Sequence, residues 1–398
     1  MLIILFFLLS LGTFYQLSIG DTNYNLLFIE ILLLILLLIV FINSIYIKSV
    51  KEKDIKNYKN KTKSLIQNTL NEYNRVYFLL ITIMIIYSVL TLVWSPFGIS
   101  SLLATITYMY MLILFFIFSA NNFTTESYFV ANRFFTVSIF IQILLSLYRN
   151  DVGEIYDYYS IKHIVSTMLG NSNYLAVFVG LIFVSEIISQ KKYWQVFSLI
   201  SGSLVFLTLS KSGLLAIFIS LFIYEIFNLK SQLKKNKKKV IFLIVFFFIL
   251  GLIVITKSRI GNIFFNALVN AVSTGSLSGR ELLISEALKD ILSYPMGMGY
   301  SIIGDPHNML LISIRSFGIL FGLVTIFIFL IPLIRGIKKN ILLMSRTTKG
   351  LYFGYLTLVI HSMFEIFFFT NAATIWVTIT IILLEREMEN EYSSYTKL

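Results

Sequence analysis

The chain has 398 residues, of which 57% are hydrophobic and only 13% are charged, and its formal net charge is +12. Soluble domains carry roughly 25% charged residues, so this composition excludes an ordinary soluble protein and predicts a polytopic membrane protein. The chain has no Cys, which excludes disulfides, thiolate catalysis and Cys-based metal sites.

Apolar runs along the chain predict an all-α bundle that forms a single transmembrane domain over residues 1–398. A membrane span needs roughly 20 mostly apolar residues, and about twelve stretches meet or approach this condition. They are 1–19, 25–47, 76–94, 99–120, 128–148, 168–189, 194–210, 212–228, 240–256, 308–331, 350–369 and 370–384. The first is interpreted as a retained span, because it has neither a basic n-region nor a small-residue cleavage site.

Basic residues are distributed unevenly between the loops, and this asymmetry predicts the orientation of the bundle. With the N-terminus inside, the inner segments hold 23 of the 32 Lys and Arg residues and the outer segments hold seven. The positive-inside rule favours this orientation. It makes 48–75 a basic cytoplasmic loop and explains the net charge without nucleic acid as a partner. Arg133 lies within a span near its inner end, where we expect its side chain to snorkel.

The longest outer segment is 257–307, and it contains a predicted amphipathic helix. Ser278 and Glu281 fit a capping box, and the helix is expected to run to about Tyr294, before Pro295. Such a helix either lies on the outer membrane surface or packs over the mouth of the bundle. Arg280 in its first turn, beside unpaired backbone N–H groups, suits an anion such as phosphate. Pairing with a lipid headgroup or a nearby Glu is the structural alternative.

His307 and Asn308 follow this helix and stand at the outer mouth of the next predicted span. A single His at such a place is either a catalytic base or a cap and interfacial anchor. Arg315 follows about two turns further on, on a similar face. Ionisable residues inside a membrane are functional candidates, so we treat Arg315 as one.

Other polar residues fall at the same predicted depth. Lys211 marks an outer turn, and Asn173 lies at the outer start of a span, where it either binds a ligand or caps the helix. His361 and Glu365 are spaced i,i+4 within the span 350–369, so they are expected to share one face. They are either part of the site or a structural pair that joins two helices. Metalloprotease, P-loop, dinucleotide-binding and GxSxG motifs are absent from the sequence.

Four motifs in chain order resemble the O-antigen ligase/polymerase superfamily of bacterial surface-polysaccharide assembly. They are GNSNYLA at 170–176, LSKSG at 209–213, SGRELLISEAL at 278–288 and HNMLLISIRSFG at 307–318. The resemblance covers roughly 170–370. It implies a GT-C-like helical bundle in the cytoplasmic membrane with an extracytoplasmic active site. It also implies that Arg280 contacts a diphosphate and that His307 acts at the acceptor hydroxyl.

Members of this superfamily transfer a glycan from a polyprenyl diphosphate carrier, so the resemblance implies no cofactor and no metal ion. The implied partners are the lipid-linked oligosaccharide, membrane lipid, and candidate accessory proteins such as a flippase and a chain-length regulator. The superfamily usually has Arg where this chain has Lys211. Lys keeps the charge but not the two-pronged donor geometry of Arg.

Three functions fit these observations. A polymerase would move the growing glycan onto the next lipid-linked repeat, and a ligase would move finished glycan onto a lipid or protein. A transporter of lipid-linked oligosaccharide also fits about twelve spans. Transporters often have broken helices near the midplane, whereas the four Pro residues of this chain all fall outside the predicted spans. The polymerase is therefore the favoured prediction.

Overall fold

The computed structural model describes residues 2–19, 22–27, 72–120, 123–149, 165, 167, 172–232, 280–301, 304–365 and 369–395. Within these ranges the chain is helical apart from one β-hairpin. In chain order the elements are α1 (Leu2–Ser10), β1 (Thr13–Ile19), β2 (Thr22–Leu27), α4 (Glu72–Leu90), η1 (Thr91–Val93), η2 (Gly98–Ser101), α5 (Leu102–Ala120), α6 (Thr125–Arg149), α8 (Ser172–Ser189), α9 (Trp194–Leu207), α10 (Lys211–Gln232), α13 (Arg280–Ser293), α14 (Met309–Lys338), η4 (Ile341–Leu343), α15 (Arg346–Ser362) and α16 (Asn371–Tyr395).

Six helices of the described ranges are long and apolar enough to cross a membrane. They are Asn74–Val93, Gly98–Phe118, Thr125–Arg149, Ser172–Ser189, Lys211–Asn228 and Met309–Lys338. Each matches one predicted span. The predicted spans 194–210 and 370–384 correspond to the helices α9 and α16, and the predicted span 350–369 is helical only up to Ser362, where α15 ends. The span 240–256 and most of 25–47 lie outside the described residues. The structure therefore supports a helical membrane protein, whereas the number of twelve spans stays a prediction.

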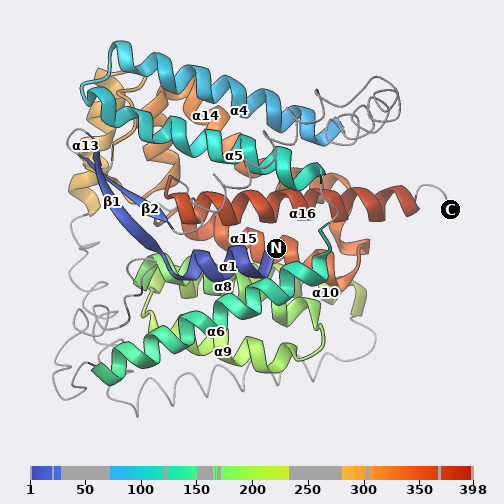
Figure 1. Cartoon of the computed structure of the whole chain (residues 1–398). Coiled ribbons are helices and arrows are strands. Elements are labelled where there is room, and N and C mark those ends of the chain that lie inside the picture. The colour runs from blue at the N-terminus through green and yellow to red at the C-terminus, as the bar shows by residue number, and fades with distance from the viewer. Residues whose placement is uncertain are drawn as a thin grey trace, which may run out of the picture.

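The long helices run between two ends of the bundle (Figure 1). We call them the α13 end, on the left of the figure, and the C-terminal end, on the right. At the C-terminal end, Glu385 of α16 accepts a hydrogen bond from Tyr77 at 2.8 Å and pairs with Arg335 at 3.1 Å. Arg346 and Gln190 are hydrogen-bonded there too. Gln190, Arg335 and Arg346 belong to loops that are predicted to lie on the inner side of the membrane, and they all lie at this one end of the bundle.

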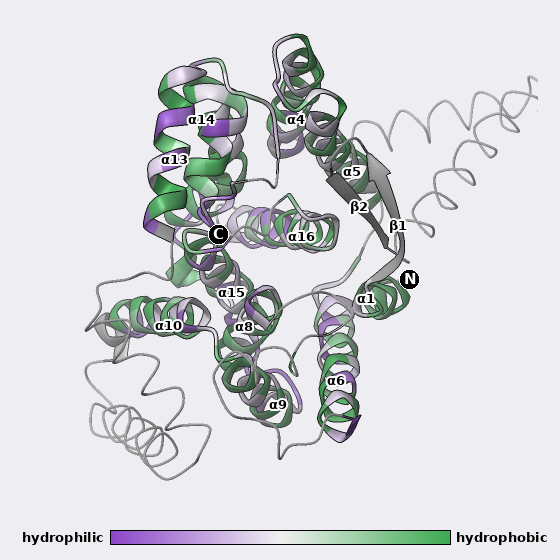
Figure 2. Ribbon diagram, turned by 90° about the vertical axis from the view of Figure 1, so that its left-hand side faces the viewer, coloured by the Kyte–Doolittle hydropathy of each residue, from purple (hydrophilic) through white to green (hydrophobic). Residues whose placement is uncertain are grey.

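Helix α16 lies in the middle of the bundle, as the view from the α13 end shows (Figure 2). Its Trp376 is fully buried. The indole ring packs against Phe6, Phe135 and Phe178, with ring centroids 4.5, 4.4 and 4.9 Å away. Buried aromatic contacts of this kind stabilise packing beyond their area alone. They join α1, α6 and α8 to the central helix.

The first 19 residues are not one helical span, and that prediction is wrong. Helix α1 covers nine residues and ends before Gly12, whose φ of +68° is a common helix-terminating conformation. The next residues, TFYQLSI, pair antiparallel with TNYNLL, from Thr13 opposite Leu27 to Ile19 opposite Thr22. Aromatic and β-branched residues interspersed with polar ones favour strands over a continuous apolar helix. The predicted second span accordingly loses its first residues to β2.

Helix α14 is broken at Gly318, whereas the sequence predicted a continuous span over 308–331. Gly318 has φ +73° and ψ 175°, which no helix accommodates. The two segments then lie so close that a Cβ on Gly322 would be 2.6 Å from Ile314 Cα. Pro332 lies inside the second segment, and not outside the span as predicted. The second segment, from 319 to 338, is still long enough to span about 30 Å.

Candidate active site

Helix α13 lies across the end of the bundle and not along it (Figures 1 and 2). Its bounds agree with the helix predicted from the capping box, although Ser278 itself lies outside the described residues. Ala287 is buried, whereas Leu288 and Leu292 are exposed. Arg280 is the first residue of α13, and its side-chain role stays a prediction because that side chain lies outside what the structure describes.

The loop after α13 is held in the break of α14. The backbone N–H groups of Met298 and Gly299 donate to the carbonyls of Arg315 and Ser316 at 3.0 and 2.9 Å. These are carbonyls that the kink at Gly318 leaves without helical partners. Gly297 has φ +83°, and a Cβ there would lie 2.4 Å from Gly318 N. The Gly-rich segment PMGMG therefore fits the kink because it has no side chains at the contact points.

His307 and Glu365 form the centre of the candidate site. His307 Nδ1 lies 3.3 Å from Glu365 Oε2, and their side chains are 40% and 9% exposed. Asn173 Nδ2 donates to the other carboxylate oxygen of Glu365 at 2.7 Å. The structure thus brings together three residues that the sequence singled out separately. A carboxylate at Nδ1 fixes the tautomer in which Nε2 accepts protons.

The backbone around His307 is strained and tightly bonded. His307 has φ +50°, which is uncommon for a residue with a side chain and is concentrated at functional sites. Its N–H donates to Asp305 Oδ1 at 2.6 Å. Burial raises the pKa of the Asp305 carboxyl, while the hydrogen bond from His307 opposes that rise. Asp305 stands two residues before His307, a spacing that is typical of such a turn.

Asn308 joins His307 to the helix that follows and to the end of α15. Its side-chain oxygen accepts from Leu311 N at 3.1 Å, so Asn308 is the N-cap of α14. Its Nδ2 donates to the carbonyl of Met363 at 2.8 Å. Asn308 therefore caps α14 and also joins it to the segment that carries Glu365, while a role of Asn308 in binding substrate stays a prediction.

His361 and Glu365 differ from the expected i,i+4 pair. Helix α15 ends at Ser362, so Glu365 lies beyond the helix, where its carboxylate contacts Asn173 and His307. His361 Nε2 instead lies 2.9 Å from Ser212 Oγ, at the start of α10. The neighbouring Lys211 is the first residue of α10. Sequence reasoning missed Ser212, although it stands inside the LSKSG motif.

Arg315 contacts helix α13 and the loop that leads to His307. Its Nε donates to Asp290 Oδ2 of α13 at 2.7 Å, and its Nη1 donates to the carbonyl of Gly304 at 3.1 Å. The structure places Arg315 against α13 and the loop that leads to His307.

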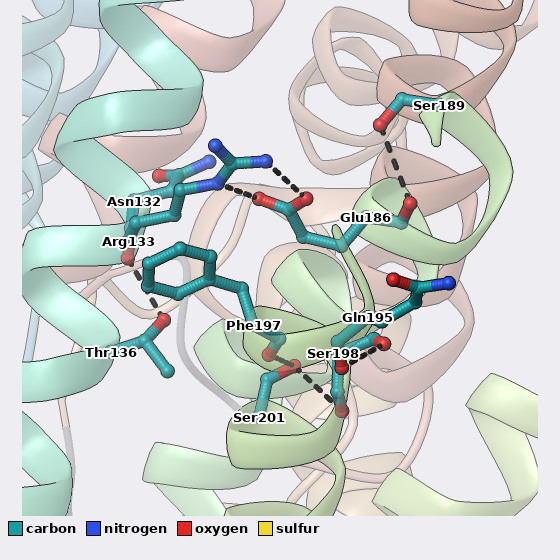
Figure 3. A network of polar contacts seen from close by, with 9 residues as sticks. All are labelled: Asn132, Arg133, Thr136, Glu186, Ser189, Gln195, Phe197, Ser198 and Ser201. Carbon is teal, nitrogen blue, oxygen red and sulfur yellow. Dashed lines mark hydrogen bonds and ion pairs between the residues drawn. The ribbon is translucent and has the colours of Figure 1, made fainter. Parts of the chain in front are cut away.

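A buried ion pair between Arg133 and Glu186 lies away from this site (Figure 3). Arg133 donates from Nε and Nη2 to the two carboxylate oxygens of Glu186 at 2.7 and 2.8 Å. Their side chains are 12% and 0% exposed, and the Phe197 ring lies 4.7 Å from Arg133 Cζ. The expectation that Arg133 snorkels is wrong, because a carboxylate on the neighbouring helix pairs with it. Glu186 is 13 residues beyond Asn173 on α8, or about 20 Å along the helix.

The residues that the structure describes contain no cluster of side chains suited to bind a metal ion. No three of their His, Asp or Glu side chains gather as a metal site would require. The site is thus a histidine with a carboxylate and an amide behind it, near the first turns of α8, α10 and α14. This arrangement suits proton abstraction from a hydroxyl group.

Comparison with known proteins adds no family. No model of a known protein family matches the chain, and no curated protein matches it either. The resemblance to the O-antigen ligase/polymerase superfamily accordingly rests on the four sequence motifs alone.

Proposed function

We propose that the protein is a membrane polysaccharide polymerase that transfers a growing glycan from a polyprenyl diphosphate carrier to a lipid-linked repeat. The observation that carries the proposal is the group formed by His307, Glu365 and Asn173. In this group His307 removes a proton, Glu365 orients His307, and Asn173 holds Glu365. The group lies at one end of the membrane bundle, where a lipid-linked substrate would bind. We propose that this end of the bundle faces the outside of the cell, because the basic loops are predicted to lie inside.

In the proposed reaction, His307 Nε2 takes the proton of the acceptor sugar hydroxyl. The hydroxyl oxygen then bonds to the anomeric carbon of the donor, and the bond from that carbon to the carrier diphosphate breaks. The diphosphate leaves with its negative charge, so it needs cations more than it needs an acid. Arg280 and Lys211 are the candidates for that role, because each stands in the first turn of a helix, where the backbone dipole adds positive charge.

The test is polymer formation by purified protein in lipid bilayers, with lipid-linked repeats as both donor and acceptor. His307→Gln and His307→Ala should insert and accumulate but slow polymer formation by about 10²–10⁴-fold, the usual contribution of a general base. Near-normal polymer from His307→Gln would reduce this residue to a positioning role. A ligase differs in its acceptor alone, so offering a lipid or protein acceptor beside the lipid-linked repeat separates the two activities.

A transporter of lipid-linked oligosaccharide is the second candidate, and two observations favour it. Helix α14 is broken at Gly318, and Arg133 pairs with Glu186 inside the apolar helices. Broken helices and intramembrane charges are typical of transport pathways. The break, however, is filled by the loop segment 297–299. Movement of fluorescent lipid-linked oligosaccharide across proteoliposomes, without any polymer formed, would establish this alternative.

A further inference from the structure

Arg315 connects three segments that meet beside the candidate site. Its Nε donates to Asp290 Oδ2 of α13 at 2.7 Å, and these side chains are 6% and 30% exposed. Its Nη1 donates to the carbonyl of Gly304, three residues before His307, at 3.1 Å. Arg315 itself stands in the first segment of α14. One guanidinium therefore contacts α13 and the chain leading to His307.

The backbone of the same residue holds the loop from the other side. The carbonyl of Arg315 accepts from Met298 N at 3.0 Å, in the loop that follows α13. Gly304 has φ +67°, and a Cβ there would lie 3.2 Å from Arg315 Nη2. The loop from α13 to His307 is thus held by Arg315 at two points. The backbone carbonyl of Arg315 binds Met298, and its guanidinium binds Gly304.

We propose that Arg315 is a positioning residue that acts through Asp290 and does not itself bind the substrate. The pair sets the rotation and the place of α13, and so the first turn in which Arg280 stands, relative to His307. Asp290 follows Arg280 by ten residues, about 15 Å along the helix. A diphosphate that approached this edge of Arg315 would meet the carboxylate of Asp290 first. This inference rests on the function proposed above for the site.

The two roles predict different results at Asp290. If Arg315 binds the diphosphate, Asp290→Asn removes a competing negative charge and leaves donor affinity equal or higher. If Arg315 positions α13, Asp290→Asn causes the same defect as Arg315→Gln, and the double variant is no worse than either single one. The exchanged pair, Arg315→Asp with Asp290→Arg, should then recover part of the loss.

A readout that does not need activity comes from Cys substitution, because the chain has no Cys of its own. Ala287 of α13 is buried, and Ser285 on the same helix is exposed. Ala287→Cys should react slowly with an impermeant maleimide, and faster once Arg315→Gln or Asp290→Asn is added. Ser285→Cys should react at one rate in every background. Arg335→Gln, in the ion pair at the C-terminal end, is the matched control and should leave the Ala287→Cys rate unchanged.

The enzymatic readout is the separation of kcat from KM with a lipid-linked donor. Arg315→Gln and Asp290→Asn should each lower kcat by about 10²-fold, the typical cost of misplacing a catalytic group by 1 Å. The proposal is overturned if Asp290→Asn changes neither the Ala287→Cys rate nor kcat while Arg315→Gln raises KM. If wild-type protein makes no polymer, the proposed function fails, and the maleimide rates alone still decide whether the pair holds α13.

Discussion

His307 Nδ1 lies 3.3 Å from Glu365 Oε2, and Asn173 donates to the second oxygen of the same carboxylate at 2.7 Å. Three segments, before α14, after α15 and in the first turn of α8, thereby meet at one carboxylate. The carboxylate orients the imidazole and stabilises the imidazolium that forms when Nε2 takes a proton, as in other carboxylate–histidine pairs. The Asn173 amide in turn holds the carboxylate.

Glu365→Gln should therefore reduce polymer formation although it changes no group that touches substrate. We expect a loss of about 10- to 100-fold, the usual effect of removing a residue that orients an active-site histidine. Glu286→Gln, on the exposed side of α13, is the matched control and should behave like wild type. Initial rates at equal amounts of folded protein measure both. Equal rates for the two variants would contradict the orienting role of Glu365.

Asp305 predicts a pH effect on stability. Burial raises the pKa of its carboxyl above the unfolded value, so its ionisation is less favourable in the folded protein. Its contribution to stability is therefore greatest at pH values below the unfolded pKa and declines as the pH rises through the folded pKa. Asp305→Asn keeps an oxygen for the His307 N–H but does not ionise, so it should exceed wild type in stability near neutral pH.

Thermal unfolding in detergent between about pH 8 and about pH 4 measures this difference, which should narrow as the pH falls. Asp305→Ala is the control, because it does not ionise either but leaves the N–H of His307 without its side-chain acceptor. It should be less stable than Asp305→Asn by about 1–3 kcal/mol at every pH. If the stability difference between Asp305→Asn and wild type instead grew toward low pH, burial would not raise the pKa of Asp305 in the folded protein.

Much of the fold could be predicted from hydropathy, and one element from local chemistry. Six spans follow from runs of apolar residues, and α13 follows from a capping box and a closing Pro. The break at Gly318 could not be predicted, because one Gly in an apolar run leaves the helical period unchanged. The hairpin after α1 was missed because its first strand continues the apolar run of α1, and the polar residues within the strands were not weighed against a helix.

The members of the candidate site were predictable, but their pairing was not. His307, Asn173 and Glu365 stand out as polar residues at span ends, yet only the folded bundle places them side by side. Spacing suggested that Glu365 would meet His361, and this reasoning assumed a helix that in fact ends at Ser362. Tertiary structure decided the partner, since a residue beyond a helix end no longer follows the helical period.

The Arg133–Glu186 pair is expected to contribute to stability and not to chemistry. Removing one partner leaves the other charged and buried, which typically costs about 3–5 kcal/mol. Arg133→Gln and Glu186→Gln should each lower the amount of folded protein, and the exchange of the two residues should restore part of it. The measurement is monodisperse protein by size-exclusion chromatography, with turnover per folded molecule close to wild type. A normal yield with lost turnover would instead place the pair in a transport or catalytic pathway.

Arg280 tests the proposed diphosphate contact. Lys in its place keeps the charge but loses the planar fork that matches two phosphate oxygens. Losing one charge-assisted hydrogen bond of about 1.5–3 kcal/mol should slow turnover by about 10- to 150-fold. Lys289→Arg, on the exposed side of the same helix, is the matched control and should be neutral. Normal polymer from Arg280→Lys at equal expression would make Arg280 a surface anchor.

The orientation of the bundle decides whether the proposed chemistry takes place outside the cell. Ser285 on α13 and Ser394 near the end of α16 are both exposed and belong to opposite ends of the bundle. With basic loops inside, Ser285→Cys should react with an impermeant thiol reagent in intact cells, and Ser394→Cys should react only after the membrane is opened. Since no native Cys competes, each single-Cys protein gives an unambiguous signal. Labelling of Ser394→Cys alone in intact cells would mean that the bundle has the opposite orientation. His307 and Glu365 would then lie on the cytoplasmic side, and transfer from a lipid-linked donor at the outer face of the membrane would be contradicted.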